Sequence, residues 1–233
     1  MNGIYHKRLP AMLGCILIPL AVGCANFGSM PSWMPFTRQA SNDLPGLTPP
    51  AERIDKLRDL AKDASRSTPQ QAEQTCLELA GTIRVEEDPM IRAEIVRTLG
   101  AYRGLTADSV LRAAVDDPDE DVRIAACEAW GKRRDAAAAG ALGEVLADDI
   151  DTDVRLAAAR ALGESSDAAA VVALGTVLAD KDPALQYRAV LSLRKITGKN
   201  FDNDVRRWQQ YVRTTYPQPA DAPSVAGQPP QKF

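Results

Sequence analysis

The sequence is almost without histidine. Its 233 residues contain one, His6, so no imidazole occurs after that position. Imidazole is the commonest general acid or base, it activates most serine and cysteine nucleophiles, and it binds zinc and haem. This shortage argues against most catalytic centres and against those metal sites. A glycine-rich phosphate loop is also missing, because Gly140 and Gly143 stand in an alanine-rich stretch without the required Lys and Ser or Thr.

The sequence also lacks an excess of basic charge. Lys and Arg number 28 against 31 Asp and Glu, for a formal net charge of −3. Proteins that bind nucleic acid need a basic footprint. We therefore expect no nucleic-acid partner. The one basic run, Lys132-Arg133-Arg134, is more typical of a solvated helix end than of a polyanion site.

One short phrase recurs four times in the middle of the chain. The copies begin at Asp88, Asp119, Asp151 and Asp182, and their fifth residues are Arg92, Arg123, Arg155 and Gln186. These fifth residues are separated by 31, 32 and 31 positions. Seven positions after each of them comes a bulky apolar residue, namely Leu99, Trp130, Leu162 and Leu193. A fixed period with helical content inside each copy is the signature of a repeat solenoid.

Each copy predicts two helices. The aspartate stands where the first helix begins, and its carboxylate can cap the free backbone N–H groups of the first turn. Gly100, Gly131 and Gly163 follow the bulky residue, and we expect them to end the helix by adopting a left-handed conformation. The second helix is predicted over residues 106–115, 135–146 and 167–178. One pair buries too little apolar surface to stand alone, so each pair must be covered by the next.

The phrase D-x-x-V-R, followed by an alanine-rich stretch and Leu-Gly, resembles HEAT repeats of the short bacterial type called PBS-lyase HEAT-like. The resemblance covers residues 88–198 clearly and 51–216 in degenerate form. It implies an all-α, armadillo-like α-solenoid in which the Asp and Arg of the phrase form a structural ladder between neighbouring pairs. It also implies that the second helix of each pair lines a concave binding face. The functional implication is broad, because such repeats occur in scaffolds, adaptors and a few enzymes.

Extending the register outward predicts five antiparallel helix pairs. Residues 51–64 and 68–85 form an N-terminal pair without the signature arginine. Residues 204–213 form a closing helix, whose Trp208 and Tyr211 cover the last exposed core face.

Two features that could mark a site are explained by the repeat. Cys127 occupies the position of Val96, Ala159 and Val190, so we expect a buried hydrophobic residue there, and a disulfide with Cys76 is not expected. Asp149, Asp151 and Asp153 imitate the opening of a calcium loop, but Val154 and Arg160 replace the Gly and Glu that such a loop needs. Helix capping and Asp–Arg pairing account for these acidic clusters. We expect no catalytic residue, metal or cofactor.

The first residues predict export and lipid attachment. Lys7 and Arg8 precede an apolar run over residues 9–22, which is the pattern of a secretory signal and is too short for a comfortable membrane span. The run ends in Leu20-Ala-Val-Gly-Cys24, which resembles a bacterial lipobox and so implies acylation of Cys24. Ala21 departs from the usual Leu, and nearby cleavage by signal peptidase I is the alternative. By resemblance to Gram-negative lipoproteins, Ala25 favours sorting to the outer membrane.

The sequence thus divides into four parts. They are a signal peptide (1–23), the lipidated Cys24 with a Pro-rich tether (24–50), the solenoid (51–216) and a Pro-rich tail expected to be disordered (217–233). Removal of residues 1–23 takes away only Lys7 and Arg8 among charged residues, which leaves 26 basic against 31 acidic residues and a balance of −5.

These observations together favour a non-enzymatic scaffold. We expect a HEAT-repeat protein that is held by its N-terminal lipid on the periplasmic face of the outer membrane. There it would bind a protein partner in the bacterial cell envelope. The alternatives are a HEAT-like-repeat enzyme of the chromophore-lyase type and a structural envelope spacer without a discrete ligand.

Overall fold

The computed structural model describes residues 48–217. Ten α-helices occupy this range and form five consecutive pairs, which confirms the predicted all-α solenoid. The helices are α1 (Pro50–Asp63), α2 (Pro69–Ile83), α3 (Pro89–Leu99), α4 (Leu105–Ala114), α5 (Glu120–Arg133), α6 (Ala136–Asp148), α7 (Thr152–Leu162), α8 (Ala168–Thr176), α9 (Pro183–Thr197) and α10 (Val205–Thr215). Short 3-10 segments, Ala64–Arg66 and Val177–Ala179, follow α1 and α8. The predicted signal peptide, Cys24, nearly all of the tether and nearly all of the tail lie outside the described residues.

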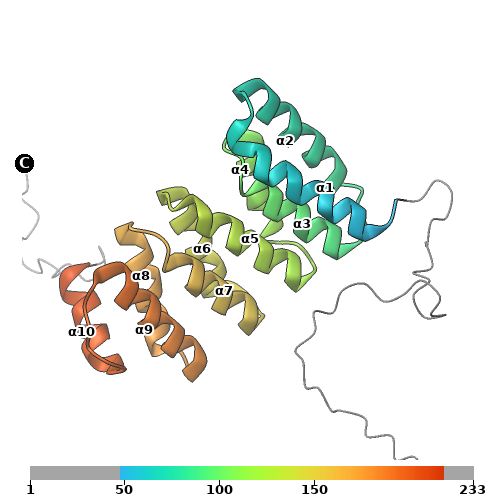
Figure 1. The fold of residues 1–233 in the computed structure, drawn as a ribbon. Coiled ribbons are helices and arrows are strands. Elements are labelled where there is room, and N and C mark those ends of the chain that lie inside the picture. Colours follow the sequence, from blue (N-terminus) through green and yellow to red (C-terminus); the bar gives the residue numbers. More distant parts are fainter. Residues whose placement is uncertain (1–47, 218–233) are drawn as a thin grey trace, which may run out of the picture. The chain divides into compact units, whose positions relative to one another are not determined.

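The helices pack in two layers (Figure 1). The odd-numbered helices, α1 to α9, pack side by side in chain order and form the first layer. The even-numbered helices form the second layer, and from α3 on each first helix contacts the second helix of its own pair. Contacts therefore join neighbouring repeats, which is the arrangement that the 31-residue period predicts.

The core lies between the two layers. The four bulky residues of the repeat, Leu99, Trp130, Leu162 and Leu193, are all fully buried. Cys127 is also fully buried, at the position that Val96, Ala159 and Val190 take in the other repeats. Burial raises the pKa of the Cys127 thiol to about 12, so the thiol stays protonated at neutral pH. Cys127 and Cys76 are both free cysteines.

The repeated glycines do not end the helices in the way that the sequence suggests. Gly100 and Gly163 have φ of −58° and −62°, and Gly131 lies inside α5. The expectation of a left-handed conformation at these positions was therefore wrong.

What these glycines permit is close contact with the next repeat. A Cβ on Gly100 would lie 2.8 Å from the Cβ of Ala129, and one on Gly131 would lie 2.9 Å from the Cβ of Ala161. At Gly163 the Oγ of Ser192 would be 2.7 Å away. The first-layer helices approach one another at these points, and no larger residue fits without a shift.

Arg133 corrects a second expectation, because it is buried rather than solvated. Its guanidinium forms an ion pair with Asp108 and donates a hydrogen bond to the carbonyl oxygen of Tyr102 at 3.0 Å. It also lies 5.2 Å from the ring centre of Trp130. Only 6% of Arg133 is exposed. Of the basic run, only Lys132 and Arg134 are exposed to solvent.

Aromatic side chains close the C-terminal end of the stack. Trp208 in α10 is fully buried, and its ring centre lies 4.9 Å from that of Phe201 and 6.0 Å from that of Tyr211. Its indole Nε1 donates a hydrogen bond to the carbonyl oxygen of Asp202 at 3.2 Å. Trp208 thus covers the last core face, as the sequence predicts for a capping helix.

Candidate interaction surface

The four signature aspartates begin the first-layer helices α3, α5, α7 and α9. Each side chain accepts a hydrogen bond from the backbone N–H two residues later: Asp88 from Met90 (2.9 Å), Asp119 from Asp121 (3.0 Å), Asp151 from Asp153 (2.8 Å) and Asp182 from Ala184 (2.8 Å). A helix leaves its first N–H groups without intrahelical partners, and a carboxylate at this position satisfies one of them. The repeated aspartate is therefore a helix cap.

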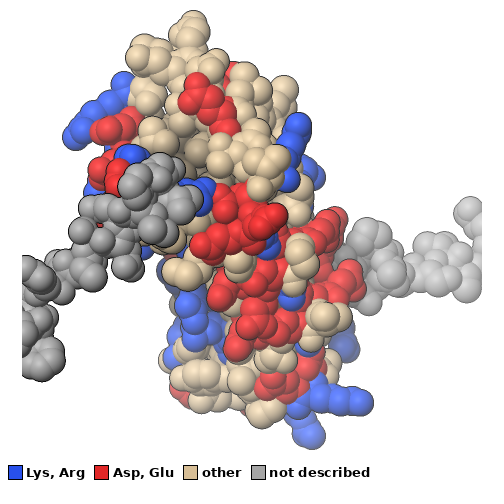
Figure 2. Space-filling model, turned by 90° about the vertical axis from the view of Figure 1, so that its right-hand side faces the viewer, with Lys and Arg blue, Asp and Glu red and all other residues tan. Residues whose placement is uncertain are grey.

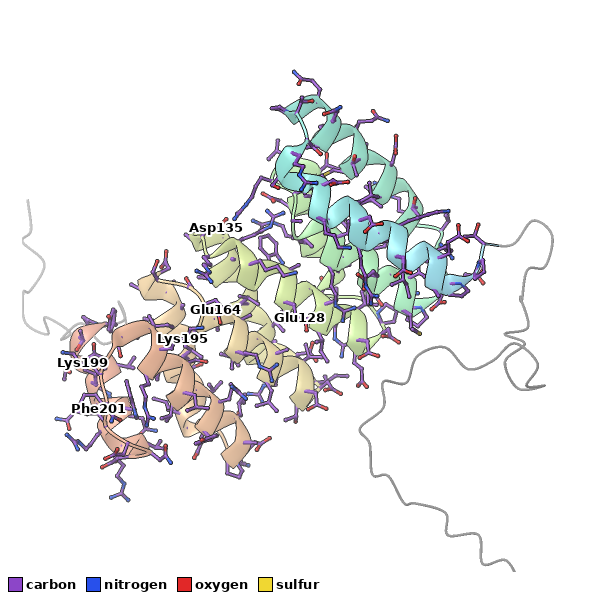
Figure 3. All side chains as sticks on the ribbon, viewed as in Figure 1. Glu128, Asp135, Glu164, Lys195, Lys199 and Phe201 are labelled. Carbon is purple, nitrogen blue, oxygen red and sulfur yellow. The ribbon has the colours of Figure 1, made fainter. Side chains whose placement is uncertain are left out.

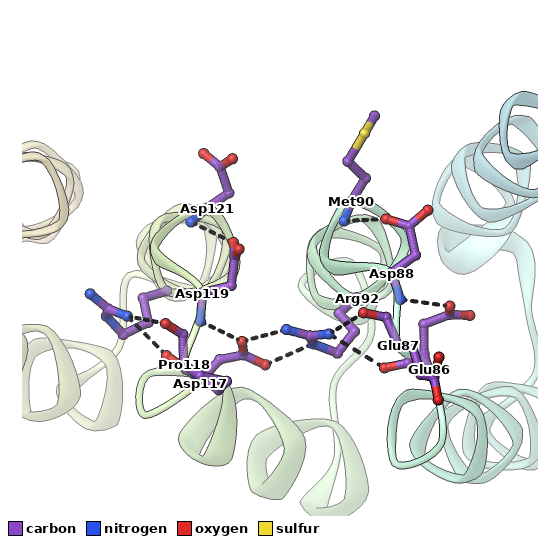
Figure 4. A network of polar contacts seen from close by, with 10 residues as sticks. Glu86, Glu87, Asp88, Met90, Arg92, Asp117, Pro118, Asp119 and Asp121 are labelled. Carbon is purple, nitrogen blue, oxygen red and sulfur yellow. Dashed lines mark hydrogen bonds and ion pairs between the residues drawn. The ribbon is translucent and has the colours of Figure 1, made fainter.

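The signature arginines bind a different set of aspartates (Figure 4). The Nε and Nη2 atoms of Arg92 lie 3.0 and 2.9 Å from the carboxylate oxygens of Asp117. Arg123 holds Asp149 in the same two-pronged way, at 2.8 and 3.3 Å. The resemblance implied a ladder made by the Asp and Arg of the phrase itself. The ladder instead uses an aspartate two residues before the next signature aspartate.

This ladder spans the described repeats from one end to the other. Arg155 binds Asp180 at 2.6 Å, and Arg53 in α1 binds Glu86. The N-terminal pair, which lacks the signature phrase as expected, therefore still supplies an arginine to the ladder. The hydrogen bond from Arg53 is the main cause that lowers the pKa of Glu86. Gln186 ends the ladder, since its amide only donates a hydrogen bond to the carbonyl oxygen of Asp180, at 2.6 Å.

The ladder carboxylates were not predicted from the sequence, although their spacing follows the repeat. Glu86, Asp117, Asp149 and Asp180 each stand two residues before a signature aspartate and so share its period. Each also accepts a hydrogen bond from the backbone N–H of that aspartate, at 2.8 to 3.1 Å. Their pairing with an arginine that precedes them by 25 or 26 residues, or by 33 for Glu86, depends on how the repeats stack.

Capping and ladder contacts account for much of the acidic character of one edge of the stack. Figure 2 shows a band of Asp and Glu side chains on the side where the first-layer helices begin. At the turns before α5 and α7, Asp117 and Asp149 are each bound by an arginine. Over residues 48–217, no three His, Cys, Asp or Glu side chains are arranged to hold a metal ion. Nor is any helix there long and apolar enough to cross a membrane.

The second layer carries a row of grooves. One groove lies between α2 and α4 (about 390 Å³), one between α4 and α6 (about 480 Å³), one between α6 and α8 (about 490 Å³) and one between α8 and α10 (about 250 Å³). Neighbouring grooves share lining residues: Glu144 and Asp148 line both grooves beside α6, and Val172 and Thr176 line both grooves beside α8. The grooves beside α6 and α8 thus form one continuous surface.

Small side chains open these grooves. The groove between α6 and α8 is lined largely by alanine and glycine, among them Gly140, Gly143 and Ala147. The alanine tracts of the sequence therefore serve two purposes. Their buried members, such as Ala138 and Ala139, allow the layers to pack closely, and their exposed members leave an indented surface that another chain can approach.

The first-layer face differs, because several of its charged residues form ion pairs between neighbouring repeats. Glu128 binds Arg97 at 3.0 Å, and Glu164 receives both Arg134 and Lys195 (Figure 3). These pairs join neighbouring repeats and border a groove of about 270 Å³ between α5 and α7. The second-layer surface is consequently the stronger candidate for binding.

The fold and the ladder define a class of protein, an α-solenoid of stacked helix pairs. The model of the HEAT-repeat family matches residues 78–157 and 139–206. The chain belongs to the HEAT-repeat family. No curated protein sequence matches it.

One similar solved structure is human deoxyhypusine hydroxylase in complex with glycerol. That protein shares 21% identity with this chain at a TM-score of 0.48. The match covers 53% of this chain and 44% of the hydroxylase, so the chain spans less than half of that structure. Such a likeness carries no conclusion about activity.

Proposed function

We propose that this protein is a membrane-tethered, non-enzymatic scaffold that binds another protein through the second layer of its solenoid. The proposal rests on the observation that the repeated Asp and Arg residues stabilise the stack, whereas the second layer presents open grooves. The repeated Asp and Arg side chains are used in caps and in the ladder, where they hold one repeat to the next. What the stack presents in addition is a row of grooves along the second layer. Repeat proteins use extended surfaces of this kind to bind partners.

The tether is proposed from the sequence. Cys24 ends a lipobox-like stretch, and a lipid on this residue would place the solenoid at a bacterial membrane, on the periplasmic face of the outer membrane. A single acyl chain gives marginal binding at ~0.8 kcal/mol per buried methylene, whereas two or three chains hold a protein durably. The Pro-rich residues between Cys24 and α1 would separate the solenoid from the bilayer.

Site-specific photo-crosslinking tests the scaffold. A photoreactive amino acid at Ala147, exposed on the second layer, should give a discrete crosslinked species in cells that make the protein. The matched control places the same amino acid at Arg160, which is exposed on the first layer. Equal crosslinking at both positions would contradict the assigned surface. The lack of any discrete species along the second layer would favour the structural spacer instead.

A further inference from the structure

The groove between α4 and α6 differs chemically from the other second-layer grooves. Its base is apolar, formed by Val115, Ala141 and Val145. Its rim carries the exposed carboxylates of Asp116, Glu144 and Asp148, together with one cation, Arg112. The ion pairs beside it join Arg92 to Asp117 and Arg123 to Asp149, and neither uses the three rim carboxylates.

The three carboxylates are not part of the repeat framework. The positions equivalent to Asp116 and Asp148 hold Val85 in the preceding repeat and Ala179 in the following one. In the register of the buried residues Leu111, Leu142 and Leu174, the positions equivalent to Glu144 hold Ala113 and Thr176. A residue needed for capping or for the ladder recurs in every repeat, as Asp117, Asp149 and Asp180 do. The rim carboxylates occur only in the two repeats that flank this groove.

The groove is also where the second layer is least closely packed. Neighbouring second-layer helices are in direct contact at α2–α4, α6–α8 and α8–α10, and α4 and α6 contact each other less. Trp130 of α5 takes the position of a leucine in the other repeats, and its Nε1 donates a hydrogen bond to the carbonyl oxygen of Leu111 in α4 at 3.2 Å. The guanidinium of Arg112 lies 5.9 Å from the Trp130 ring centre, at the rim of the same groove.

From these observations we infer that the groove between α4 and α6 binds an extended segment of a protein partner in which Lys or Arg alternates with aliphatic residues. This inference rests on the proposed scaffold function and specifies its ligand. Successive side chains of an extended segment point to opposite faces, so the cationic ones would meet Glu144 and Asp148 on the α6 side of the groove. The aliphatic ones, on the other face, would cover Val115 on the α4 side, and Asp116 would add negative charge to the rim. Glu144 and Asp148 lie one helical turn apart, at roughly 5–6 Å between Cβ atoms. Alternate residues of an extended chain lie about 6.6 Å apart on one face, which matches this spacing.

The test uses a fluorescent eight-residue peptide of alternating lysine and leucine, titrated with the full chain in mild detergent. We expect saturable binding, followed by anisotropy, that weakens as salt rises. The triple variant Asp116→Asn, Glu144→Gln, Asp148→Asn should bind about tenfold more weakly, since each exposed ion pair contributes only modestly. The matched control is Glu120→Gln, Asp121→Asn, Asp153→Asn, which removes the same charge from the acidic edge outside the groove. It should change affinity less than about twofold.

Several outcomes would overturn the inference. Equal weakening of peptide binding by the groove and edge variants would show that the peptide is attracted by the overall negative charge and not by this groove. No binding of the peptide to the unmodified chain would contradict the proposed ligand. Equal binding of a peptide with serine for leucine would remove the role of the apolar base. Unchanged melting temperatures of both triple variants establish that their folds are intact. If the crosslink at Ala147 persists in the groove variant while peptide binding was never seen, the scaffold function stands and this inference alone fails.

Discussion

Arg123 in one repeat forms a two-point ion pair with Asp149, which stands just before the first helix of the next repeat. The Nε and Nη2 atoms of Arg123 lie 2.8 and 3.3 Å from the two carboxylate oxygens of Asp149. The same guanidinium donates from Nη1 to the carbonyl oxygen of Asp117, at 2.9 Å, just before its own helix. One side chain therefore fixes both the entry to α5 and the contact with the following pair. Only 12% of the Arg123 side chain and 6% of the Asp149 side chain are exposed.

This burial predicts a large effect of breaking the pair. Arg123→Ala should lower the free energy of unfolding by ~3–5 kcal/mol, because it leaves the buried Asp149 carboxylate unpaired. The control, Arg160→Ala, removes an exposed arginine and should stay within about 0.5 kcal/mol of the unmodified protein. Urea unfolding followed by circular dichroism measures both. Equal midpoints would mean that the ladder does not hold the stack.

The glycine contacts predict opposite effects of one substitution at two sites. Gly131→Ala should destabilise the protein by ~1–3 kcal/mol, since the new Cβ would lie 2.9 Å from that of Ala161. Gly140→Ala should be stabilising by ~0.5–1 kcal/mol, because nothing lies within 4 Å of a Cβ there and alanine favours the helix. Thermal melting distinguishes them. Ala161→Gly should partly restore the Gly131→Ala variant, and a lack of rescue would contradict steric contact as the cause.

The aromatic cap predicts that damage at the C-terminal end remains local. Trp208→Ala should lower the free energy of unfolding of the last pair by ~3–5 kcal/mol, because it removes a buried aromatic side chain. Hydrogen exchange should rise over residues 183–213, while the backbone around Arg123 and Arg155 stays protected by its neighbours. Loss of protection along the whole of the described stack would indicate a single cooperative core and would argue against separable repeats.

Acid should weaken the ladder. The hydrogen bond from Arg53 lowers the pKa of Glu86 from 4.5, and the backbone N–H of Asp182 together with Arg155 lowers the pKa of Asp180 from 3.8. A carboxylate whose pKa is lower in the folded state stabilises the fold above its unfolded pKa and stops doing so as pH falls through the folded one. Stability should therefore hold from pH 7 to pH 5 and fall below pH 4.5.

Glu86→Gln provides the control for this pH dependence. The variant should be less stable at pH 7 and should lose less stability on acidification, because the group that titrates is gone. Glu120 has the opposite effect on the pH dependence of stability, because its hydrogen bond with Asp151 raises the pKa of Glu120. Parallel stability curves for the unmodified protein and Glu86→Gln would rule out Glu86 as a source of the acid sensitivity.

The membrane tether is tested by replacing its cysteine. Cys24→Ser removes the thiol that would carry the lipid, so the protein should become soluble or remain unprocessed. Fractionation followed by a carbonate wash measures the change. Cys15→Ser is the matched control, because Cys15 precedes the lipobox-like stretch and should leave membrane association unaltered. Normal processing and equal membrane retention of Cys24→Ser would exclude lipid attachment at this residue.

Sequence by itself determined the features that depend on local geometry. The 31-residue period placed the helices, because one buried residue per turn suffices to reveal the face of a helix. The caps at Asp119 and Asp151 were also predictable, since a cap bonds the backbone only two residues away. The terminal position of Trp208 followed from the same register.

Only the tertiary structure decided which residues of neighbouring repeats contact one another. Asp117 pairs with Arg92 and Gly131 meets Ala161 only because neighbouring helices stack at a particular distance and rotation. A period shows that a residue recurs without showing which residue of the next repeat it touches. For the same reason the small residues of α6 could equally be packing or surface, and the groove beside Asp116 and Glu144 became visible only once α4 and α6 were placed side by side. These features depend on the distances between repeats, and those distances exist only once the helices are packed.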